Sequence, residues 1–366
     1  MLTLRGISKN FGRTRALVNV DLDMPAGHRF VLIGGSGAGK TTLLRVLAGL
    51  EPPDSGTIFC DEVDITHAPP HLRGIALLSQ DYAIYPHLTL EKNLLAAIEP
   101  LKLKAAERAD RLESALGWFE LMPLRGRRPA QLSGGQLQRA ALAKALIRRP
   151  KVLLLDEPLS QLDLMLKEQG RGLILSLTEQ FETTLVMVTH DPIDALRMSD
   201  SLAVIEGGAI VQVDTPQMVY RSPRSRLVAD MLSPFGINQV EHDGELSMVK
   251  SPVDLPVDCR GYSPFGVATQ RIYFRPEAGN LVEPSVREQS ADDIVLVGKV
   301  VRLQFLGFAT LAFVSLLNQN KSYQDKPQLI KVLVRDDNVA FGVGHSVGVR
   351  VSVGDLLSLE SEQKVV

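Results

Sequence analysis

Eight residues near the N-terminus carry the clearest chemistry in the sequence. Residues 34–41 read Gly-Gly-Ser-Gly-Ala-Gly-Lys-Thr and fit the spacing Gly-x-x-x-x-Gly-Lys-[Ser/Thr] at every fixed position. Glycines let the backbone turn tightly enough to direct several N–H groups at one point, and the start of a following helix adds positive charge there. We therefore expect a polyphosphate at this loop, with the Lys40 ammonium on its β- and γ-phosphates and the Thr41 hydroxyl on a bridging magnesium ion.

The segments around this loop support that interpretation. Residues 30–33 are apolar and favour a strand, while residues 42–49 favour a helix that ends on glycine. A flexible glycine-rich linker is the alternative, but it would not need this strand and helix. The residues expected to contact the polyphosphate are Gly34, Gly35, Ser36, Gly37, Ala38, Gly39, Lys40, Thr41 and Thr42.

A second apolar strand ends on two carboxylates. Residues 152–155 are Val-Leu-Leu-Leu, and Asp156 and Glu157 follow directly. Since unpaired buried charge is costly, acidic residues at the end of a buried strand need a partner. Beside a polyphosphate, Asp156 can hold the magnesium ion directly or through water, and Glu157 can act as the general base on an attacking water. The alternative is an acidic turn after a core strand.

A second anion site is expected at residues 132–136, Leu-Ser-Gly-Gly-Gln, just before a helix expected over residues 137–148. A serine hydroxyl, glycine amides and a helix N-terminus together suit a phosphate. The residues that form this site, called the signature segment below, are Ser133, Gly134, Gly135 and Gln136. One chain would thus have two phosphate-binding surfaces.

Strands and helices alternate through much of the chain, which predicts an α/β fold with a largely parallel sheet covered on both faces. A helical insertion is predicted from residue 89 to about residue 127. The expected strands are 1–7, 16–22, 29–33, 57–60, 75–78, 152–155, 184–188 and 201–205, and two further helices are expected at 164–180 and 193–198. Beyond residue 230, short runs rich in Val and Leu at 294–303, 329–334 and 346–353 predict a small β domain.

Composition narrows the class of protein. The chain has 366 residues, which suggests two domains, and its 40 basic and 42 acidic residues argue against coating nucleic acid by bulk charge. Cys60 and Cys259 form neither a disulfide framework nor a metal cluster, which suits two incidental thiols in a reducing compartment. The longest apolar stretch, residues 306–317, is shorter than the roughly 20 residues of a membrane-spanning helix and is expected to form strands. The N-terminus lacks the order of a signal peptide, so we expect a location inside the cell.

The three motifs, in this order, resemble those of the ATP-binding cassette (ABC) family, and the resemblance covers residues 1–230. In that family two ATP-binding domains pair head to tail, and each ATP lies between the phosphate loop of one domain and the signature segment of the other. The resemblance implies a P-loop NTPase cassette over residues 1–235, with a helical subdomain at about 89–150. It also implies a small regulatory domain of oligonucleotide-binding-like barrel form over residues 236–366.

The same resemblance assigns further residues. Phe11 matches the aromatic residue that stacks on adenine, although an ordinary core Phe is an alternative. Gln80 matches the glutamine that senses magnesium and the γ-phosphate, and His190 matches the histidine that contacts the γ-phosphate. Their alternatives are an exposed polar turn and a structural histidine. Asp163 matches the aspartate that crosses the dimer interface. The implied cofactors are ATP and Mg²⁺, and the implied assembly is a homodimer.

Residues 69–89 are similar to the importer branch of the family, whose ATPases drive uptake of sugars, glycerol-3-phosphate, polyamines or ferric iron. In that branch, the residues after Gln80 dock two transmembrane permease subunits, and an external solute-binding protein acts indirectly. The apolar residues expected to form this docking surface are Tyr82, Ile84, Tyr85, Pro86 and Leu88. The chain is thus expected on the cytoplasmic face of the inner membrane as a peripheral ATPase, without nucleic acid.

The resemblance leaves the solute open. A carbohydrate or a glycerol-3-phosphate-like solute is the first expectation, and a polyamine, ferric iron or another anion is the alternative. The chain departs from the importer pattern at Gly35, Ser79, Leu137 and Lys144, none of which removes a catalytic group. Two glycines in the helix at 164–176 should weaken it by about 1 kcal/mol each relative to alanine.

Two other classes share the cassette. A DNA-repair or chromosome-associated ATPase typically adds a long coiled coil or zinc modules, and the sequence shows neither sustained heptads nor cysteine clusters. A translation-associated ATPase usually has two cassettes in one chain, whereas one Leu-Ser-Gly-Gly-Gln is present here. For residues 236–366, binding of a small anion or a signalling protein is an alternative to stabilisation of the dimer alone.

Overall fold

The structure, a computed structural model, describes residues 1–160, 162–243, 260–262, 268–284, 293–316, 328–335, 341–357 and 359. The chain divides into two compact units, Met1–Gln217 and Met218–Val366. Cys259, and the Ser-Pro-Phe-Gly segment that begins at residue 263, lie outside the described residues. No helix in the described parts of the chain combines the length and the apolar character needed to cross a membrane.

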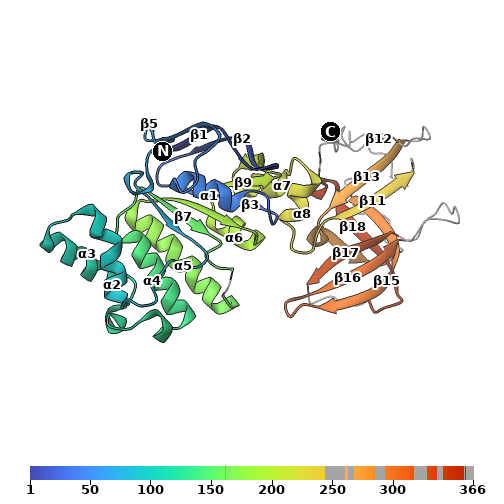
Figure 1. The fold of residues 1–366 in the computed structure, drawn as a ribbon. Coiled ribbons are helices and arrows are strands. Elements are labelled where there is room, and N and C mark those ends of the chain that lie inside the picture. The colour runs from blue at the N-terminus through green and yellow to red at the C-terminus, as the bar shows by residue number, and fades with distance from the viewer. Residues whose placement is uncertain are drawn as a thin grey trace. The chain divides into compact units, whose positions relative to one another are not determined.

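The first unit is built on a six-stranded sheet (Figure 1). In spatial order its strands are β10 (Ala209–Asp214), β9 (Ser201–Glu206), β3 (Arg29–Gly34), β8 (Thr184–Thr189), β7 (Val152–Asp156) and β6 (Ile75–Leu78). All neighbours are parallel except β10, which runs antiparallel to β9. Every residue of β8 is buried, as expected for a strand covered on both faces. The predicted parallel α/β sheet is thus confirmed, with an added antiparallel edge strand that the sequence did not reveal.

A second sheet of four strands packs over one face of the first, with α1 (Lys40–Ala48) between them (Figure 1). Its strands are β2 (Thr14–Met24), β1 (Leu2–Phe11), β4 (Ser55–Cys60) and β5 (Val63–Asp64), all antiparallel. Leu2 and Leu4 from β1 join Leu43 and Leu47 from α1 in one apolar core. The sequence predicted three of these strands but not their assembly into a separate sheet.

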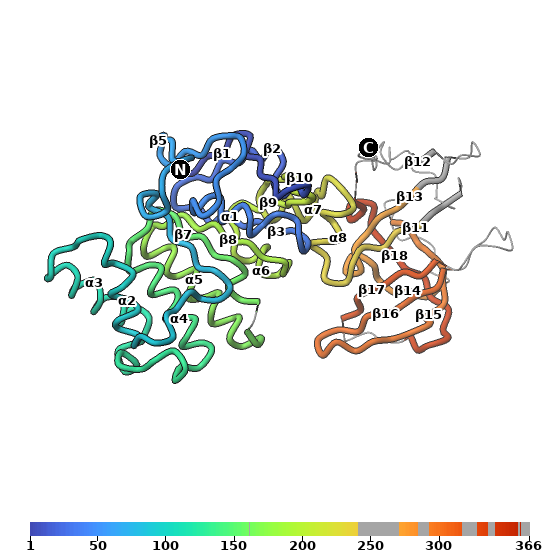
Figure 2. Tube along the Cα trace, viewed as in Figure 1, coloured from blue at the N-terminus to red at the C-terminus, as the bar shows by residue number. Residues whose placement is uncertain are grey.

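Five further helices complete the first unit. These are α2 (Leu90–Ile98), α3 (Ala105–Trp118), α4 (Gly134–Leu146), α5 (Leu164–Phe181) and α6 (Pro192–Met198). Figure 2 shows α2 and α3 grouped beside α4, in the segment where the sequence predicted a helical insertion. The predicted start of α4 at residue 137 was wrong. Ser133 accepts a hydrogen bond from the Gln136 amide and the Gln136 side chain accepts one from Ser133, so this capping box starts the helix at Gly134.

Close packing explains one of the two glycines in α5. A Cβ atom on Gly170 would lie 2.7 Å from Leu159 Cδ2 and 3.1 Å from Gln138 Nε2. The missing side chain of Gly170 thus lets α5 approach α4, a packing role that the sequence did not indicate, while its expected cost to the helix stays a prediction. Gly172 has no neighbour within 4 Å of such an atom, so its expected cost is unchanged.

The second unit contains two antiparallel sheets and α8 (Arg226–Met231), and α7 (Pro216–Arg221) spans the division between the units. One sheet has the order β11 (Asn238–Asp243), β13 (Ala268–Phe274), β12 (Arg260–Tyr262). The other has the order β14 (Gly279–Val282), β18 (Ser346–Ser352), β15 (Asp293–Phe305), β16 (Ala309–Leu316), β17 (Leu329–Arg335). Buried valines and isoleucines of both sheets share one core. The prediction of a small β domain is confirmed.

Ion pairs join α5 to α6. Arg171 Nε donates to Asp194 Oδ1 at 2.6 Å, and both side chains are about 5% exposed or less. Glu168 bonds both Arg171 and Arg197, and Lys167 Nζ lies 3.1 Å from Asp191 Oδ2. Burial raises the pKa of Asp194, against the opposing effect of Arg171. This network fixes α6, which begins two residues after His190.

Arg171→Met should lower the free energy of unfolding by about 3–5 kcal/mol, because it leaves the Asp194 carboxylate buried without its partner. Urea unfolding followed by circular dichroism measures this loss. Arg5→Met is the matched control, since it removes an ion pair to Asp23 whose side chains are 48% and 51% exposed. That control should cost less than about 1 kcal/mol. Equal losses in the two variants would contradict a stabilising role for the buried pair.

Candidate functional site

The loop between β3 and α1 forms a cradle closed by Lys40. Lys40 Nζ donates hydrogen bonds to the carbonyl oxygens of Gly34, at 2.8 Å, and Gly35, at 2.9 Å. Gly39 has a φ of 103°, and a Cβ atom there would lie 2.3 Å from the Ala16 carbonyl oxygen. Only glycine fits this position, because the backbone has a positive φ there and β2 leaves no room for a side chain.

Lys40 carries its charge in a confined place. The residue is 7% exposed, and burial lowers the pKa of its ammonium. The carboxylate of Glu157, whose Oε1 lies 4.0 Å from Lys40 Nζ, acts in the opposite direction. A buried cation lacks the stabilisation of water, and the helix N-terminus beside it is also positive. An anionic ligand such as a polyphosphate would stabilise both.

Asp156 and Thr41 lie together at the edge of this cradle. Thr41 Oγ1 donates to Asp156 Oδ1 at 3.2 Å. Burial raises the pKa of Asp156, and the hydrogen bond from Thr41 partly offsets this effect. A hydroxyl and one carboxylate are a donor set that fits magnesium, which keeps several waters and takes its other ligands from substrate phosphates. The described residues contain no group of three acidic, histidine or cysteine side chains that would bind a metal without such a ligand.

Glu157 is held in an unusual conformation beside His190. Its φ is 48°, in the left-handed region that a residue other than glycine seldom adopts. The Glu157 amide donates to the Val188 carbonyl at 3.0 Å, and Glu157 Oε1 lies 3.0 Å from His190 Nδ1. Strained residues of this kind persist where surrounding contacts fix them, and they cluster at functional sites.

A cavity of about 700 Å³ brings most of these residues together. Its lining comprises Phe11, Thr14, Ala16, Ser36, Gly37, Ala38, Gly39, Lys40, Thr41, Thr42, Glu157 and His190. Phe11 is 48% exposed, which argues against the alternative of an ordinary core side chain. Sequence reasoning missed Thr14 and Ala16, because β2 reaches the loop only through tertiary packing. No motif marks either residue.

The structure does not place every predicted residue at this cavity. Gln80 is exposed at the end of β6 and is not part of its lining. Asp163 caps α5 by accepting a hydrogen bond from the Leu166 amide. Three signature residues, Ser133, Gly135 and Gln136, line a different cavity of about 550 Å³.

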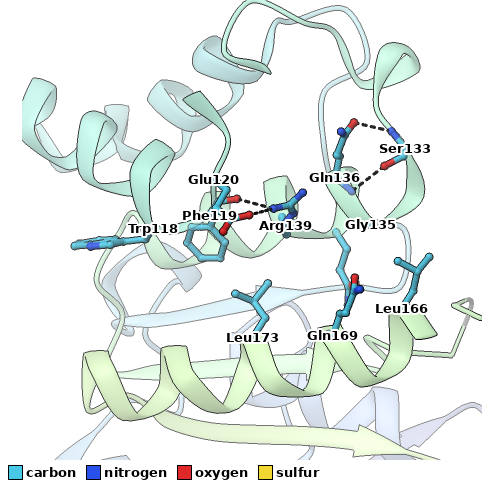
Figure 3. A pocket seen from close by; sticks show the side chains of 12 residues that line it. Trp118, Phe119, Glu120, Ser133, Gly135, Gln136, Arg139, Leu166, Gln169 and Leu173 are labelled. Carbon is cyan, nitrogen blue, oxygen red and sulfur yellow. Dashed lines mark hydrogen bonds and ion pairs between the residues drawn. The ribbon is translucent and has the colours of Figure 1, made fainter. Parts of the chain in front are cut away.

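Figure 3 shows this second cavity between α4 and α5. Gln136 and Ser133 bond each other at the start of α4, while Arg139 donates to Glu120 Oε2 at 2.8 Å. The first amides of α4 belong to Gly134 and Gly135, whose lack of side chains leaves the helix N-terminus open. The two predicted anion sites therefore line separate cavities within one chain.

Comparison with known proteins identifies the family. The family described as ABC transporter matches residues 17–160. The chain is 39% identical over 278 residues to the Fe(3+) ions import ATP-binding protein FbpC of Vibrio cholerae, covering 76% of this chain and 79% of that protein. It is 36% identical over 333 residues to the spermidine/putrescine import ATP-binding protein PotA 2 of Pseudomonas aeruginosa, covering 87% of this chain and 88% of that protein.

Two further similarities support the same family. The chain is 42% identical over 240 residues to the sn-glycerol-3-phosphate import ATP-binding protein UgpC 1 of Rhizobium johnstonii, covering 66% of this chain and 65% of that protein. It also resembles the dimeric, post-hydrolysis structure of the ATP-binding cassette MJ0796 bound to ADP and Pi. That match has a TM-score of 0.53 and 29% identity, and it covers 59% of this chain and 99% of that one. The chain thus belongs to the ABC transporter family, as an ATP-binding and hydrolysing subunit of an importer.

Proposed function

We propose that the cavity lined by Lys40, Glu157 and His190 is where this ATPase binds and hydrolyses ATP to power solute import. One observation carries the proposal. Glu157 Oε1 lies 3.0 Å from His190 Nδ1 and 4.0 Å from Lys40 Nζ, at the point where the phosphate-binding loop meets α1. The three side chains thus converge on one place, as a base, a γ-phosphate contact and a charge-neutralising cation must around one reacting phosphate.

Each residue has a separate role in this proposal. Lys40 moves its ammonium from the Gly34 and Gly35 carbonyls to the β- and γ-phosphates. Glu157 accepts the proton of the attacking water, and His190 holds the γ-phosphate side of the site. Thr41 and Asp156 would hold magnesium, which would neutralise charge on the phosphates, and Gln80, two residues after β6, is proposed as a further ligand. Phe11 offers its exposed ring to the adenine base.

A second copy of the chain completes the site. The cradle and the signature segment line different cavities, so one chain cannot surround one nucleotide with both. We propose a head-to-tail homodimer in which Ser133 and its neighbouring amides contact the ATP of the partner subunit. Asp163 then lies at the interface. The dimeric form of the similar cassette MJ0796 supports this arrangement.

The segment after Gln80 is proposed to dock the membrane subunits. Tyr85 is 48% exposed, whereas Ile84 and Leu88 are half-buried, so the aromatic ring is the main apolar feature of this surface. The buried Asn93 side chain fixes the segment by bonding the Tyr85 amide and carbonyl at 2.8 and 3.0 Å. Lys144 Nζ lies 3.9 Å from the Tyr85 ring centroid. Docking here would hold the ATPase at the cytoplasmic face of the membrane as a peripheral subunit.

Residues 236–366 are proposed to form a regulatory domain after an ATPase domain of residues 1–235. Within the second unit, the Arg275 guanidinium lies 3.8 Å from the centroid of the Tyr220 ring, and the Tyr220 hydroxyl donates to Glu277. This contact gives a structural role to Arg275 and Glu277, which lie in the sequence Phe-Arg-Pro-Glu at residues 274–277. The test removes residues 236–366. If the shortened chain still assembles with membrane subunits but inhibition of its ATP hydrolysis changes, the result supports regulation over stabilisation of the dimer.

The solute is the finer part of the proposal. A glycerol-3-phosphate-like solute has the support of UgpC 1, an sn-glycerol-3-phosphate import ATP-binding protein. FbpC and PotA 2 favour the alternatives, ferric iron and polyamines. The test compares solute-binding proteins, each loaded with its own solute, in reconstituted vesicles. The one that stimulates ATP hydrolysis identifies the class of solute.

Glu157→Gln should keep ATP binding while lowering turnover by a factor of about 10² or more, because the amide cannot accept the proton of water. With ATP and magnesium the variant should accumulate as a dimer. Phosphate release and size-exclusion chromatography measure the two effects, and Glu62→Gln, at an exposed turn, is the control. Undiminished hydrolysis would refute the role of Glu157 as base, and a persistent monomer would refute the composite site.

Tyr85→Ala should weaken assembly with the membrane subunits by about 2 kcal/mol, as expected for an aromatic residue at the centre of an interface. ATP hydrolysis by the isolated subunit should stay near the wild-type rate. Co-purification at several protein concentrations measures the assembly. Val63→Ala removes another apolar side chain that is 62% exposed, and this control should assemble normally. Normal assembly of the Tyr85 variant would place the docking surface elsewhere.

A further inference from the structure

We propose that Gln138 is a positioning residue that links the signature segment to Glu157. The proposal rests on the function proposed above, in which Glu157 is the general base. Gln138 lies in the second turn of α4, the helix that Ser133 caps. Nothing in its sequence position distinguishes it from a polar residue on a helix surface, yet the structure places it in the interior.

Gln138 is 3% exposed, and its Nε2 donates to the carbonyl oxygen of Pro158 at 3.1 Å. Pro158 directly follows Glu157. A buried amide that bonds a main-chain carbonyl fixes that peptide, because breaking the bond leaves a desolvated acceptor without a donor. From α4, the Gln138 side chain thus holds the peptide unit next to Glu157.

The peptide it holds needs such a constraint. Glu157 has a φ of 48°, a conformation that persists only when several contacts oppose its relaxation. The Glu157 amide donates to Val188 of β8 at 3.0 Å, and Ser160 donates to the Glu157 carbonyl from both its amide, at 3.2 Å, and its hydroxyl, at 3.0 Å. The bond from Gln138 adds a constraint from α4 to those from the sheet and the local turn.

α5 holds the Gln138 amide in place. A Cβ atom on Gly170 would approach Gln138 Nε2 to 3.1 Å and Leu159 Cδ2 to 2.7 Å. The amide is therefore packed between α5 and the segment that follows Glu157. Figure 3 shows α4 and α5 side by side below Ser133 and Gln136. A movement of α4 cannot leave the Pro158 peptide unaffected while this packing persists.

This link joins two different ATP sites in the proposed dimer. The signature segment of one chain contacts the ATP of the partner subunit, whereas Glu157 acts on the ATP of its own chain. Through Gln138, nucleotide bound at the first site sets the position of the base at the second. Loss of the link should lower the rate at which each bound ATP is hydrolysed and reduce the cooperativity between the two sites. It should not weaken ATP binding to the cradle.

Gln138→Met removes the hydrogen-bond donor and nearly keeps the side-chain volume, and Gln138→Glu keeps the shape but places an acceptor against the Pro158 carbonyl. Both variants of the full chain should show a kcat per bound ATP about tenfold below wild type, the effect of losing one buried hydrogen bond. Their KM for ATP should stay within about twofold of wild type, and their Hill coefficients should fall toward 1. Gln180→Met makes the same change at an exposed position near the end of α5, away from both cavities, and should leave all three quantities unchanged.

Counting bound ATP separates this role from a merely structural one. If either variant only lowers the fraction of chains that bind ATP, with wild-type turnover per bound ATP and a wild-type Hill coefficient, the proposal is overturned. Wild-type values throughout would overturn it as well. Full activity of Glu157→Gln in parallel would instead refute the general base itself, so failure of the proposed function is distinguishable from failure of this link.

Discussion

Parallel pairing of β3, β8 and β7 is the constraint on which the rest of the first unit depends. In this register Ile33 lies opposite Thr189, and Asp156 lies opposite Val188. The carboxyl ends of the three strands therefore meet at one edge of the sheet. Lys40, Glu157 and His190, which follow these ends, come together although they are far apart in sequence. The order of the strands therefore decides which side chains meet at this edge. The loops after the strands only position those side chains.

Burial then gives those side chains their properties. The same close packing that requires Gly39 against Ala16 encloses the Lys40 ammonium, lowers its pKa and favours a polyanion. Burial also raises the pKa of Asp156, and a magnesium ion beside it would favour the charged carboxylate. The left-handed backbone conformation of Glu157 persists because hydrogen bonds hold the peptides around it. These bonds come from β8, from a local turn and from α4.

The two helices on the other face of the sheet connect this edge to the surfaces that we propose contact other subunits. α4 begins at the signature segment and also supplies Lys144 to the segment around Tyr85. α5 begins at Asp163 and is tied to α6, next to His190, by the buried pair of Arg171 and Asp194. Each helix runs without a break from one of these contacts to the other. The ATPase edge, the proposed dimer interface and the proposed docking surface are thus joined through α4 and α5.

The sequence by itself determined what depends on local order. The spacing of residues 34–41, the carboxylates after residue 155 and the apolar strands predicted a phosphate site, a parallel sheet and a small β domain, since backbone conformation and strand burial follow from neighbouring residues. Tertiary structure alone decided what depends on packing between distant segments. It separated the four-stranded sheet, brought Thr14 and Ala16 to the cavity, required glycine at residue 170 and buried Gln138 against Pro158. Such contacts join residues that no sequence period relates, so only the folded chain shows them.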